Sequence, residues 1–323
     1  ALVKQLITKA DVMIENFAPG VIERLGLGYD EVKEINPGII YAQVKGFAEG
    51  GPYEKFLSFD MIGQAAGGIM SITGEPDGRP LKPGTTLGDT GTGMLMAISI
   101  LGALYQKKET GVGQRLTVAM QDAMLQYARL AFSDTMKTGK PSARAGEGVV
   151  TGGNAPMGLF PCKPGGSNDY VYIYVNRANN RQWHRLLEVI GQAELIGDPR
   201  FETARDRHAN KDEINAMLIP WTQARTKAEA MEIIGGAGVP CSAVYDTVEL
   251  QDNPDFETRG IFQWVEHPTR GKVKMPAWPV QMSGNDVKVK PAPLLGQHNE
   301  DVLSDWLGMS NDDIAALKTK GTV

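Results

Sequence analysis

The first 138 residues alternate between apolar patterns typical of strands and patterns typical of helices. Two short runs, 11–17 and 39–47, predict strands because they are apolar and rich in β-branched and aromatic residues. A third strand is predicted at the start of "GQRLTVAMQDAMLQYARLAFSDTM", which continues as a helix. The other predicted helices of this part lie at 2–10, within 18–38, at 59–74 and at 93–108. Strands that alternate with helices predict a parallel sheet with helical crossovers.

The pattern changes after residue 138, where "KTGKPSARAGEGVVTGGNAPMG" is rich in Gly, Pro and Ser and is typical of a linker. A strand at 169–177, a helix at 181–191, two helices within 211–235 and a strand in "VPCSAVYD" follow and predict a smaller α+β domain. We therefore predict an α/β protein with a Rossmann-like parallel sheet. Its predicted parts are a large domain at 1–138, a linker at 139–152, a small domain at 153–285 and a segment at 286–323 that returns to the large domain.

Composition narrows the classes of function. Apolar residues make up 42% of the 323 residues, which is enough for a sizeable core. The formal charge is −5 and no lysine-rich run occurs, so we expect no nucleic-acid partner. The two cysteines, Cys162 and Cys241, lie far apart in the sequence and indicate a reducing, cytoplasmic compartment. We expect no membrane-spanning segment, because the apolar run at 94–105 ends at Gln106.

The sequence begins "ALVKQLITKADVMIENF", without an initiator methionine and in the pattern of the middle of an α/β domain. We expect that an N-terminal part of a longer protein, including a first βαβ unit, precedes it. Common catalytic motifs are missing: there is no GxxxxGK[ST] loop and no GxSxG elbow. The four histidines do not have the spacing of zinc ligands, so we expect no metal site.

One acid in "LGDTGTGMLMA" stands out, because Asp89 lies among glycines directly before a long apolar run. It could cap the helix that follows, or it could be a nucleophile that a large substrate reaches over bare backbone. We expect the helix to open at Thr92 and Gly93, whose free N–H groups would favour negative charge and could hold an oxyanion. The pattern leaves both interpretations of Asp89 open and by itself favours the cap.

Several ordered motifs carry a resemblance that covers almost the whole chain. They are "ADVMIENFAPGVIERLGLGYDEVKEINPGIIYAQVKGFAEGGPY", "TGEPDGRPLKPGTTLGDTGTGM", "KETGVGQRLTVAMQDA" and "PAPLLGQHNEDVL". Together they resemble the class III CoA-transferases, the family of formyl-CoA transferase and carnitine CoA-transferase. The segments "VKGFAEG" and "VAMQDA" are most similar to formyl-CoA transferase.

The resemblance implies an activity and a nucleophile. The chain would move coenzyme A from an acyl-CoA donor to a free carboxylic acid, in a formyl-CoA:oxalate-like reaction, with coenzyme A as substrate and no permanently bound cofactor. Asp89 would attack the thioester to give an aspartyl anhydride, and the returning thiolate would give an aspartyl-CoA thioester. Family members are interlocked homodimers, which implies the same architecture for this chain.

The resemblance also implies contacts with the substrate. The predicted coenzyme A contacts are Asn16, Phe17, Ala18, Arg24, Leu57, Ser58, Phe59, Asp60 and Met120, and the predicted substrate loop contains Gly152 and Gly153. Structural alternatives remain for three of these sites: a turn at the end of a strand for residues 16–18, a solvated helix arginine for Arg24 and a core methionine for Met120.

The chain departs from the family pattern at two places. Formyl-CoA transferase tends to have a lysine and a tyrosine where this chain has Leu57 and Phe59, and its glycine loop continues with further glycines that are missing after Ala155. One alternative function is an α-methylacyl-CoA racemase, but racemases have a GHD-like segment where this chain has Ser58-Phe59-Asp60, so the histidine is missing. The other alternative is an inactive homologue that only binds coenzyme A.

Overall fold

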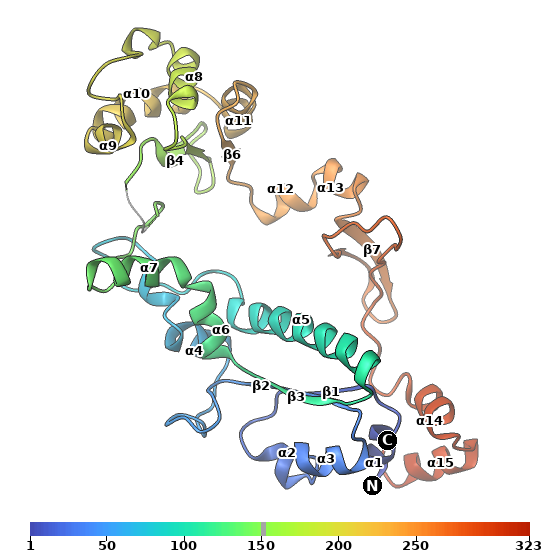
Figure 1. Ribbon diagram of the computed structural model, residues 1–323. Helices are drawn as coiled ribbons and strands as arrows, with labels where there is room; N and C mark the ends of the chain where they lie inside the picture. The colour runs from blue at the N-terminus through green and yellow to red at the C-terminus, as the bar shows by residue number, and fades with distance from the viewer. Residues whose placement is uncertain (150–152) are drawn as a thin grey trace. The chain divides into compact units, whose positions relative to one another are not determined.

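The computed structural model describes residues 1–149 and 153–323, which form two compact units (Figure 1). The first unit contains residues 1–152 together with Val302–Ile314. The second unit contains Gly153–Asp301 together with Ala315–Val323. The predicted linker at 139–152 and the predicted return segment at 286–323 stay predictions.

A parallel sheet forms the centre of the first unit. Its strands are β1 (Val12–Glu15), β2 (Ile40–Lys45) and β3 (Gln114–Ala119), in the order β1-β2-β3. Both pairs are parallel, with Val12 opposite Ile40 and Ile40 opposite Gln114. The predicted parallel sheet with helical crossovers is therefore confirmed.

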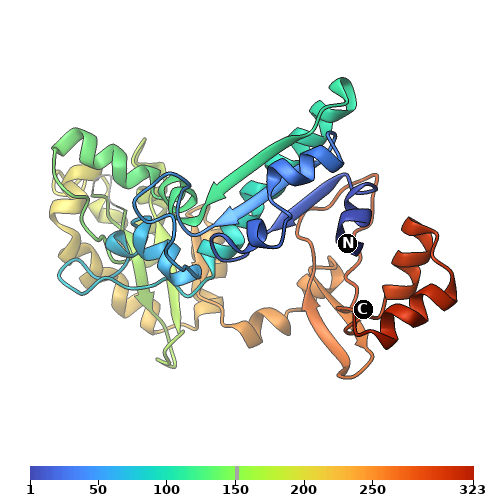
Figure 2. The same ribbon diagram turned by 90° about the horizontal axis from the view of Figure 1, so that it is seen from below.

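Helices cover both faces of this sheet (Figure 1, Figure 2). The helices before β3 are α1 (Leu2–Ile7), α2 (Val21–Arg24), α3 (Tyr29–Ile35), α4 (Asp60–Ala66) and α5 (Leu87–Thr110), with a 3₁₀ turn at Met70–Ile72. Those after β3 are α6 (Met120–Tyr127) and α7 (Arg129–Thr138). On one face Tyr41 is buried against Ile7 and Val32 of α1 and α3, and its hydroxyl donates to the carbonyl of Leu27 at 2.9 Å. On the other face α5 packs along β2 and β3.

Two predicted helix boundaries in this unit were wrong. The helix expected at 93–108 begins at Leu87, because a side chain distant in sequence satisfies its first N–H groups, as described below. The helix expected at 59–74 ends at Ala66, since Gly68 adopts a φ of 87° that only glycine tolerates well.

The helix α5 is long and apolar enough to cross a membrane by length and composition, which corrects the sequence-based expectation. The helix is longer than the run at 94–105 because glycines and threonines of nearly neutral hydropathy extend its start. It packs against β2, β3, α4 and α6 of its own unit. Helices of soluble proteins can show the same composition, so this is weak evidence for a membrane span.

The second unit is built on an antiparallel sheet of β4 (Met157–Pro161), β5 (Tyr170–Tyr174) and β6 (Cys241–Ala243), in that order. A separate hairpin contains β7 (Phe262–His267) and β8 (Gly271–Pro276). The helices of the second unit are α8 (Arg181–Ile190), α9 (Ala204–Ala209), α10 (Lys211–Gln223), α11 (Lys227–Gly236), α12 (Thr247–Gln251) and α13 (Pro254–Thr258), with a 3₁₀ turn at Ala193–Leu195. Two further helices, α14 (Asn299–Leu307) and α15 (Asn311–Thr319), each include residues from both units.

One apolar cluster forms the core of the second unit. Val171 and Ile173 of β5 are fully buried there, together with Trp183, Leu186 and Leu187 on one side of α8. This arrangement fits the predicted α+β character of the region. The strand β4 was missed because its glycine and terminal proline are unusual in a strand.

Candidate functional site

The carboxyl edge of the parallel sheet brings the sequence motifs together, as expected for an open α/β sheet. Gly46 directly follows β2, and Ser58 lies so close to it that a Cβ on Gly46 would come within 2.1 Å of the Ser58 Cβ. The N–H of Gln121, in α6, donates to the carbonyl of Gly46 at 3.2 Å. The segments "VKGF", "LSFD" and "VAMQDA" therefore meet at one glycine.

Asp89 lies in the first turn of α5, and its side chain is exposed. The residue that caps this helix is Thr86, so Asp89 is not the N-cap. The Asp89 carboxylate makes no hydrogen bond or ion pair with the residues that the structure describes. The interpretation of Asp89 as a simple cap is therefore wrong, because the group that satisfies the helix start is a different carboxylate.

That carboxylate belongs to Asp60, the first residue of α4, which is buried. Its Oδ1 accepts the N–H of Gly88 at 2.8 Å and the N–H of Asp89 at 3.3 Å. Its Oδ2 accepts from Gln64 Nε2 at 2.8 Å, and the Nζ of Lys82 lies 3.9 Å away. A carboxylate at this position satisfies orphan donors and complements the helix dipole. Asp60 therefore fixes the backbone on which Asp89 stands.

The expected oxyanion donors are also corrected. Thr92 and Gly93 lie beyond the first turn of α5, where each N–H points to the carbonyl four residues earlier. The N–H groups of Gly88 and Asp89 are already bound by Asp60. None of these four N–H groups is free to hold an oxyanion.

The glycines around Asp89 serve close packing. A Cβ on Gly88 would come within 2.5 Å of the Asp60 carbonyl oxygen, and a Cβ on Gly91 within 2.8 Å of the Tyr127 ring. The Tyr127 hydroxyl donates to the carbonyl of Gly91 at 3.0 Å. Gly93 has open space around it, so the backbone beside Asp89 stays accessible on that side.

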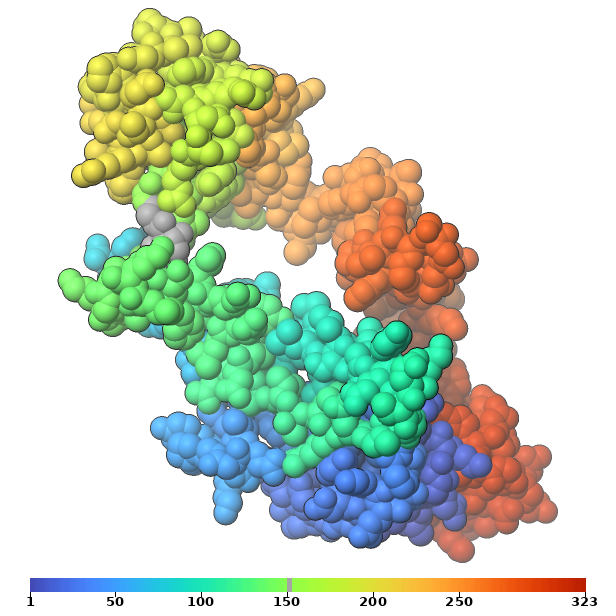
Figure 3. Space-filling view, viewed as in Figure 1, coloured from blue at the N-terminus to red at the C-terminus, as the bar shows by residue number. Residues whose placement is uncertain are grey.

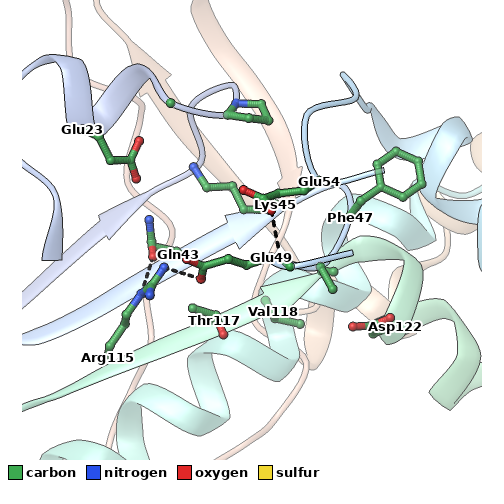
Figure 4. Close-up of a pocket in the computed structure, with 15 residues that line it drawn as sticks. Glu23, Gln43, Lys45, Phe47, Glu49, Glu54, Arg115, Thr117, Val118 and Asp122 are labelled. Carbon is green, nitrogen blue, oxygen red and sulfur yellow. Dashed lines mark hydrogen bonds and ion pairs between the residues drawn. The ribbon is translucent and has the colours of Figure 1, made fainter. Parts of the chain in front are cut away.

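A cavity of about 800 Å³ opens at the same edge of the sheet (Figure 4). Its lining includes Pro19 and Gly20 before α2, Gln43 and Lys45 of β2, and Arg115 of β3. Figure 4 shows the Arg115 guanidinium joined to Gln43 and to Glu49, with distances of 2.7 Å in both contacts. The cavity volume is in the range of small-molecule and cofactor sites.

The sequence analysis missed the polar groups that line this cavity. Gln43 and Lys45 occupy alternate positions of a strand that was predicted from its apolar residues. The alternation of Tyr41, Gln43 and Lys45 on one face was a usable signal, because polar side chains in a mostly buried strand need partners. Their main partner, Glu15, is buried at the end of β1.

The predicted coenzyme A contacts after β1 lie beside this cavity. Asn16, Phe17 and Ala18 are exposed, and they directly precede the cavity-lining Pro19. Arg24 is exposed on α2, with its Nη1 close enough to Gly20 that a Cβ there would lie 2.9 Å away. These placements are compatible with ligand contacts, which stay predictions.

The other predicted contacts differ in exposure. Leu57 and Phe59 are strongly exposed, whereas Ser58 is partly buried against Gly46. Met120 is buried and packs against Gly63 of α4, where a Cβ would come within 2.8 Å of the Met120 Cβ. This is the position of a core methionine, and Gly63 lies one turn after Asp60 in α4.

The predicted substrate loop is described only in part. Gly152 lies outside the described residues. Gly153 belongs to the second unit and packs against the His208 ring, where a Cβ would come within 2.1 Å of the imidazole. Nearby, Arg207 is fully buried and its Nε donates to the carbonyl of Ala155 at 3.0 Å.

Neither cysteine is an activated nucleophile. Burial raises the pKa of the Cys162 thiol, and it raises the pKa of the Cys241 thiol to about 12. Both thiols stay protonated at neutral pH, whereas a nucleophilic cysteine needs a lowered pKa. Within residues 1–149 and 153–323, no group of three or more His, Cys, Asp or Glu side chains could hold a metal ion. Asp89 stays the predicted nucleophile; its carboxylate is exposed, and it is not among the residues that line the cavity.

Comparison with known proteins gives the chain its family. Residues 1–299 match CoA-transferase family III. A formyl-CoA:oxalate CoA-transferase of Streptomyces coelicolor is 38% identical over 333 aligned positions, covering 100% of this chain and 80% of that protein. Another of the same name, from Rhodopseudomonas palustris, is 36% identical and covers 98% of this chain and 77% of that protein.

A solved structure agrees with these matches. The crystal structure of a CAIB/BAIF family protein from Brucella suis superposes with a TM-score of 0.80 at 31% identity, covering 94% of this chain and 78% of that one. The predicted resemblance to the class III enzymes is confirmed by the family match and by the curated relatives. The chain therefore belongs to CoA-transferase family III and is a CoA-transferase.

Proposed function

We propose that this enzyme transfers coenzyme A from formyl-CoA, or a similarly small acyl-CoA, to a small carboxylic acid such as oxalate, with Asp89 as the covalent nucleophile. The observation that carries the proposal is the exposed Asp89 carboxylate on a backbone fixed by buried Asp60. The choice of substrates rests on the relatives named formyl-CoA:oxalate CoA-transferase.

The proposed reaction divides one exchange into steps that each break one bond. The Asp89 carboxylate attacks the thioester carbonyl, the carbon–sulfur bond breaks, and coenzyme A leaves as the thiolate. The thiolate attacks the Asp89 carbonyl of the mixed anhydride, which releases the donor acid and leaves an aspartyl-CoA thioester. The acceptor carboxylate then attacks this thioester to form a second anhydride. The released thiolate finally attacks the acceptor's carbonyl, which frees acyl-CoA and Asp89.

The fixed backbone matters to this chemistry because the attacking oxygen must be aligned with the carbonyl in each step. Gly88 and Asp89 are held by hydrogen bonds from their N–H groups to Asp60. The Asp89 side chain itself stays free of protein partners within the described residues, so its oxygens remain available to the thioester.

The substrates are tested by a panel of acyl-CoA donors against free carboxylates, with products identified by mass. We expect formyl-CoA to donate to oxalate without added metal or other cofactor. Transfer between other acids only would show that the proposed substrates are wrong. Leu57 and Phe59, where the chain departs from formyl-CoA transferase, are where such a difference would originate. A panel that shows only α-epimerisation of a branched acyl-CoA would support a racemase, and binding without turnover would support an inactive homologue.

We also propose that the enzyme is an interlocked homodimer that works in the cytoplasm. One face of α5 is apolar and exposed, and its residues follow helical spacing. They are Met94, Ile98, Leu101 and Tyr105, with exposed fractions of 53%, 66%, 66% and 73%. Apolar faces of this kind mark interaction surfaces, and the resemblance provides a second copy of the chain as the partner. Light scattering at micromolar concentration should show a dimer, and a compact monomer would contradict it.

A further inference from the structure

We propose that the partly buried ion pair of Glu15 and Lys45 fixes the turn that binds coenzyme A, so that both are positioning residues for that turn. The proposal rests on the proposed function and on the contact with coenzyme A that the resemblance predicts for the turn at Asn16, Phe17 and Ala18. Neither residue touches the ligand in this account. Both act through the backbone of Phe17.

The pair holds both backbone polar groups of Phe17. The N–H of Phe17 donates to Glu15 Oε2 at 3.0 Å, and Lys45 Nζ donates to the Phe17 carbonyl at 2.9 Å. Lys45 Nζ also lies 2.7 Å from Glu15 Oε1 and 2.9 Å from Oε2. Glu15 therefore binds the N–H of Phe17, and Lys45 binds its carbonyl.

A second layer of hydrogen bonds holds the pair. Gln43 Nε2 donates to Glu15 Oε1 at 2.7 Å, and Arg115 Nε donates to Gln43 Oε1 at 2.7 Å. Arg115 in turn pairs with Glu49 at 2.7 Å (Figure 4). The network therefore joins the ends of β1 and β2 to β3, and Glu15 cannot rotate without breaking several charge-assisted bonds.

Stability alone does not account for such a pair. The Glu15 side chain is 1% exposed and that of Lys45 is 21% exposed. Well-packed apolar residues often replace a buried ion pair at no loss of stability, so this pair is better explained by what it holds. Asn16, Phe17 and Ala18 are exposed, so packing of their own side chains contributes little to fixing the turn.

The location of the pair links it to the ligand. Lys45 and Gln43 line the 800 Å³ cavity together with Pro19 and Gly20, which continue the same turn. Because Glu15 neutralises Lys45, the pair adds no net positive charge to the cavity. A direct role for Lys45 as a phosphate ligand and a positioning role therefore predict opposite results when Glu15 loses its charge.

Two substitutions separate these roles, Lys45→Met and Glu15→Gln. In the positioning account both weaken coenzyme A binding, with an increase in Kd of about tenfold measured by calorimetry. The KM for acyl-CoA should rise by a similar factor, while kcat changes little. In the double variant the two effects should be much less than additive, because both disrupt one unit.

The matched control is Lys107→Met. Lys107 pairs with Asp11 at 2.8 Å in the same unit, and its side chain is also 21% exposed. This variant should bind coenzyme A like the wild type. If Lys45→Met does not fold, Lys45→Gln is measured in the same way, and we expect a rise of KM in the same direction.

Three results would overturn the proposal. The first is an unchanged Kd in folded Lys45→Met or Lys45→Gln. The second is tighter binding by Glu15→Gln, which would make Lys45 a direct phosphate ligand. The third is a loss of active enzyme at unchanged KM, which is the result of a structural role only. Failure of the proposed function is recognised separately, because wild type would then bind coenzyme A without transferring it.

Discussion

The second unit buries one large apolar cluster and the cation Arg207, whereas the first unit buries Glu15, Gln43 and Asp60 at the carboxyl edge of its sheet. Two of these three are carboxylates, and each accepts backbone N–H groups. Asp60 binds the N–H groups of Gly88 and Asp89, and Glu15 binds that of Phe17. In the first unit, buried carboxylates therefore hold the two segments to which we assign catalysis and coenzyme A binding in our proposals.

Carboxylates also cap helices in the second unit, but there the partners are local and exposed. Glu229 and Thr226 form a capping box at the start of α11, and Asp206 and Thr203 form one at α9. The residues of each box are three positions apart, whereas Asp60 and Gly88 are 28 positions apart. The local boxes stabilise their own helices, whereas Asp60 joins two segments that are distant in sequence.

The largest effect should follow from Asp89→Asn. The amide keeps the shape and the helix, but it is a very poor nucleophile, so CoA transfer should fall by at least about 10³-fold. Product formation is measured by chromatography, and circular dichroism should show an unchanged fold. If the variant is active, and mass analysis excludes deamidation of Asn back to Asp, then Asp89 is not the nucleophile.

A smaller effect is expected from Asp60→Ala. Loss of the acceptor leaves the N–H groups of Gly88 and Asp89 without their partner, which should cost about 1–2 kcal/mol of stability. Displacement of Asp89 should lower kcat by about 10- to 100-fold. Asp60→Asn is the matched control, since its amide oxygen still accepts and should recover much of both losses. Equal kcat in the Ala variant and wild type would show that the cap does not position Asp89.

The opposite pattern is expected in the core of the second unit. Leu186→Ala removes a fully buried side chain and should lower the free energy of unfolding by about 2–5 kcal/mol. Denaturant unfolding measures this loss. Well below the unfolding transition, the KM for acyl-CoA should stay at the wild-type value. A raised KM would show that this core also shapes the coenzyme A site.

The smallest effect concerns the local cap of α11. Hydrogen bonds from the Thr226 backbone and side chain hold the pKa of Glu229 below its ordinary value of 4.5. A lowered pKa stabilises the fold above the unfolded-state value, and this contribution disappears as the pH falls through the folded-state pKa. Glu229→Gln should therefore reduce stability slightly at neutral pH and converge with wild type in acid. Thermal unfolding between pH 3 and 7 measures it, and parallel curves would contradict it.

The sequence predicts much of the architecture because strands and helices have different apolar periods. Local patterns predicted the parallel sheet, the change to a second domain after residue 138 and the existence of helix α5. The hairpin of β7 and β8 was missed although "FQWVEH" and "GKVKMP" alternate around a Gly271 turn. That omission was avoidable, because the signal is local.

The candidate site is less predictable, because its supports are distant in sequence. The start of α5 depends on Asp60, and no local motif indicates that this acid reaches Gly88. The glycines around Asp89 indicated an open turn, whereas Gly88 and Gly91 instead allow close packing inside a helix. The pair of Glu15 and Lys45 likewise joins two strands whose register only the folded sheet provides.

The central claim is that Asp89 becomes covalently bound to the substrate. Wild type is incubated with formyl-CoA, treated with hydroxylamine and digested, and the peptide that contains Asp89 is analysed by mass. We predict a hydroxamate at Asp89 that requires the acyl-CoA and is missing from Asp89→Asn. Coenzyme A transfer by the wild type with Asp89 unmodified, or with the modification on another residue, would contradict the account.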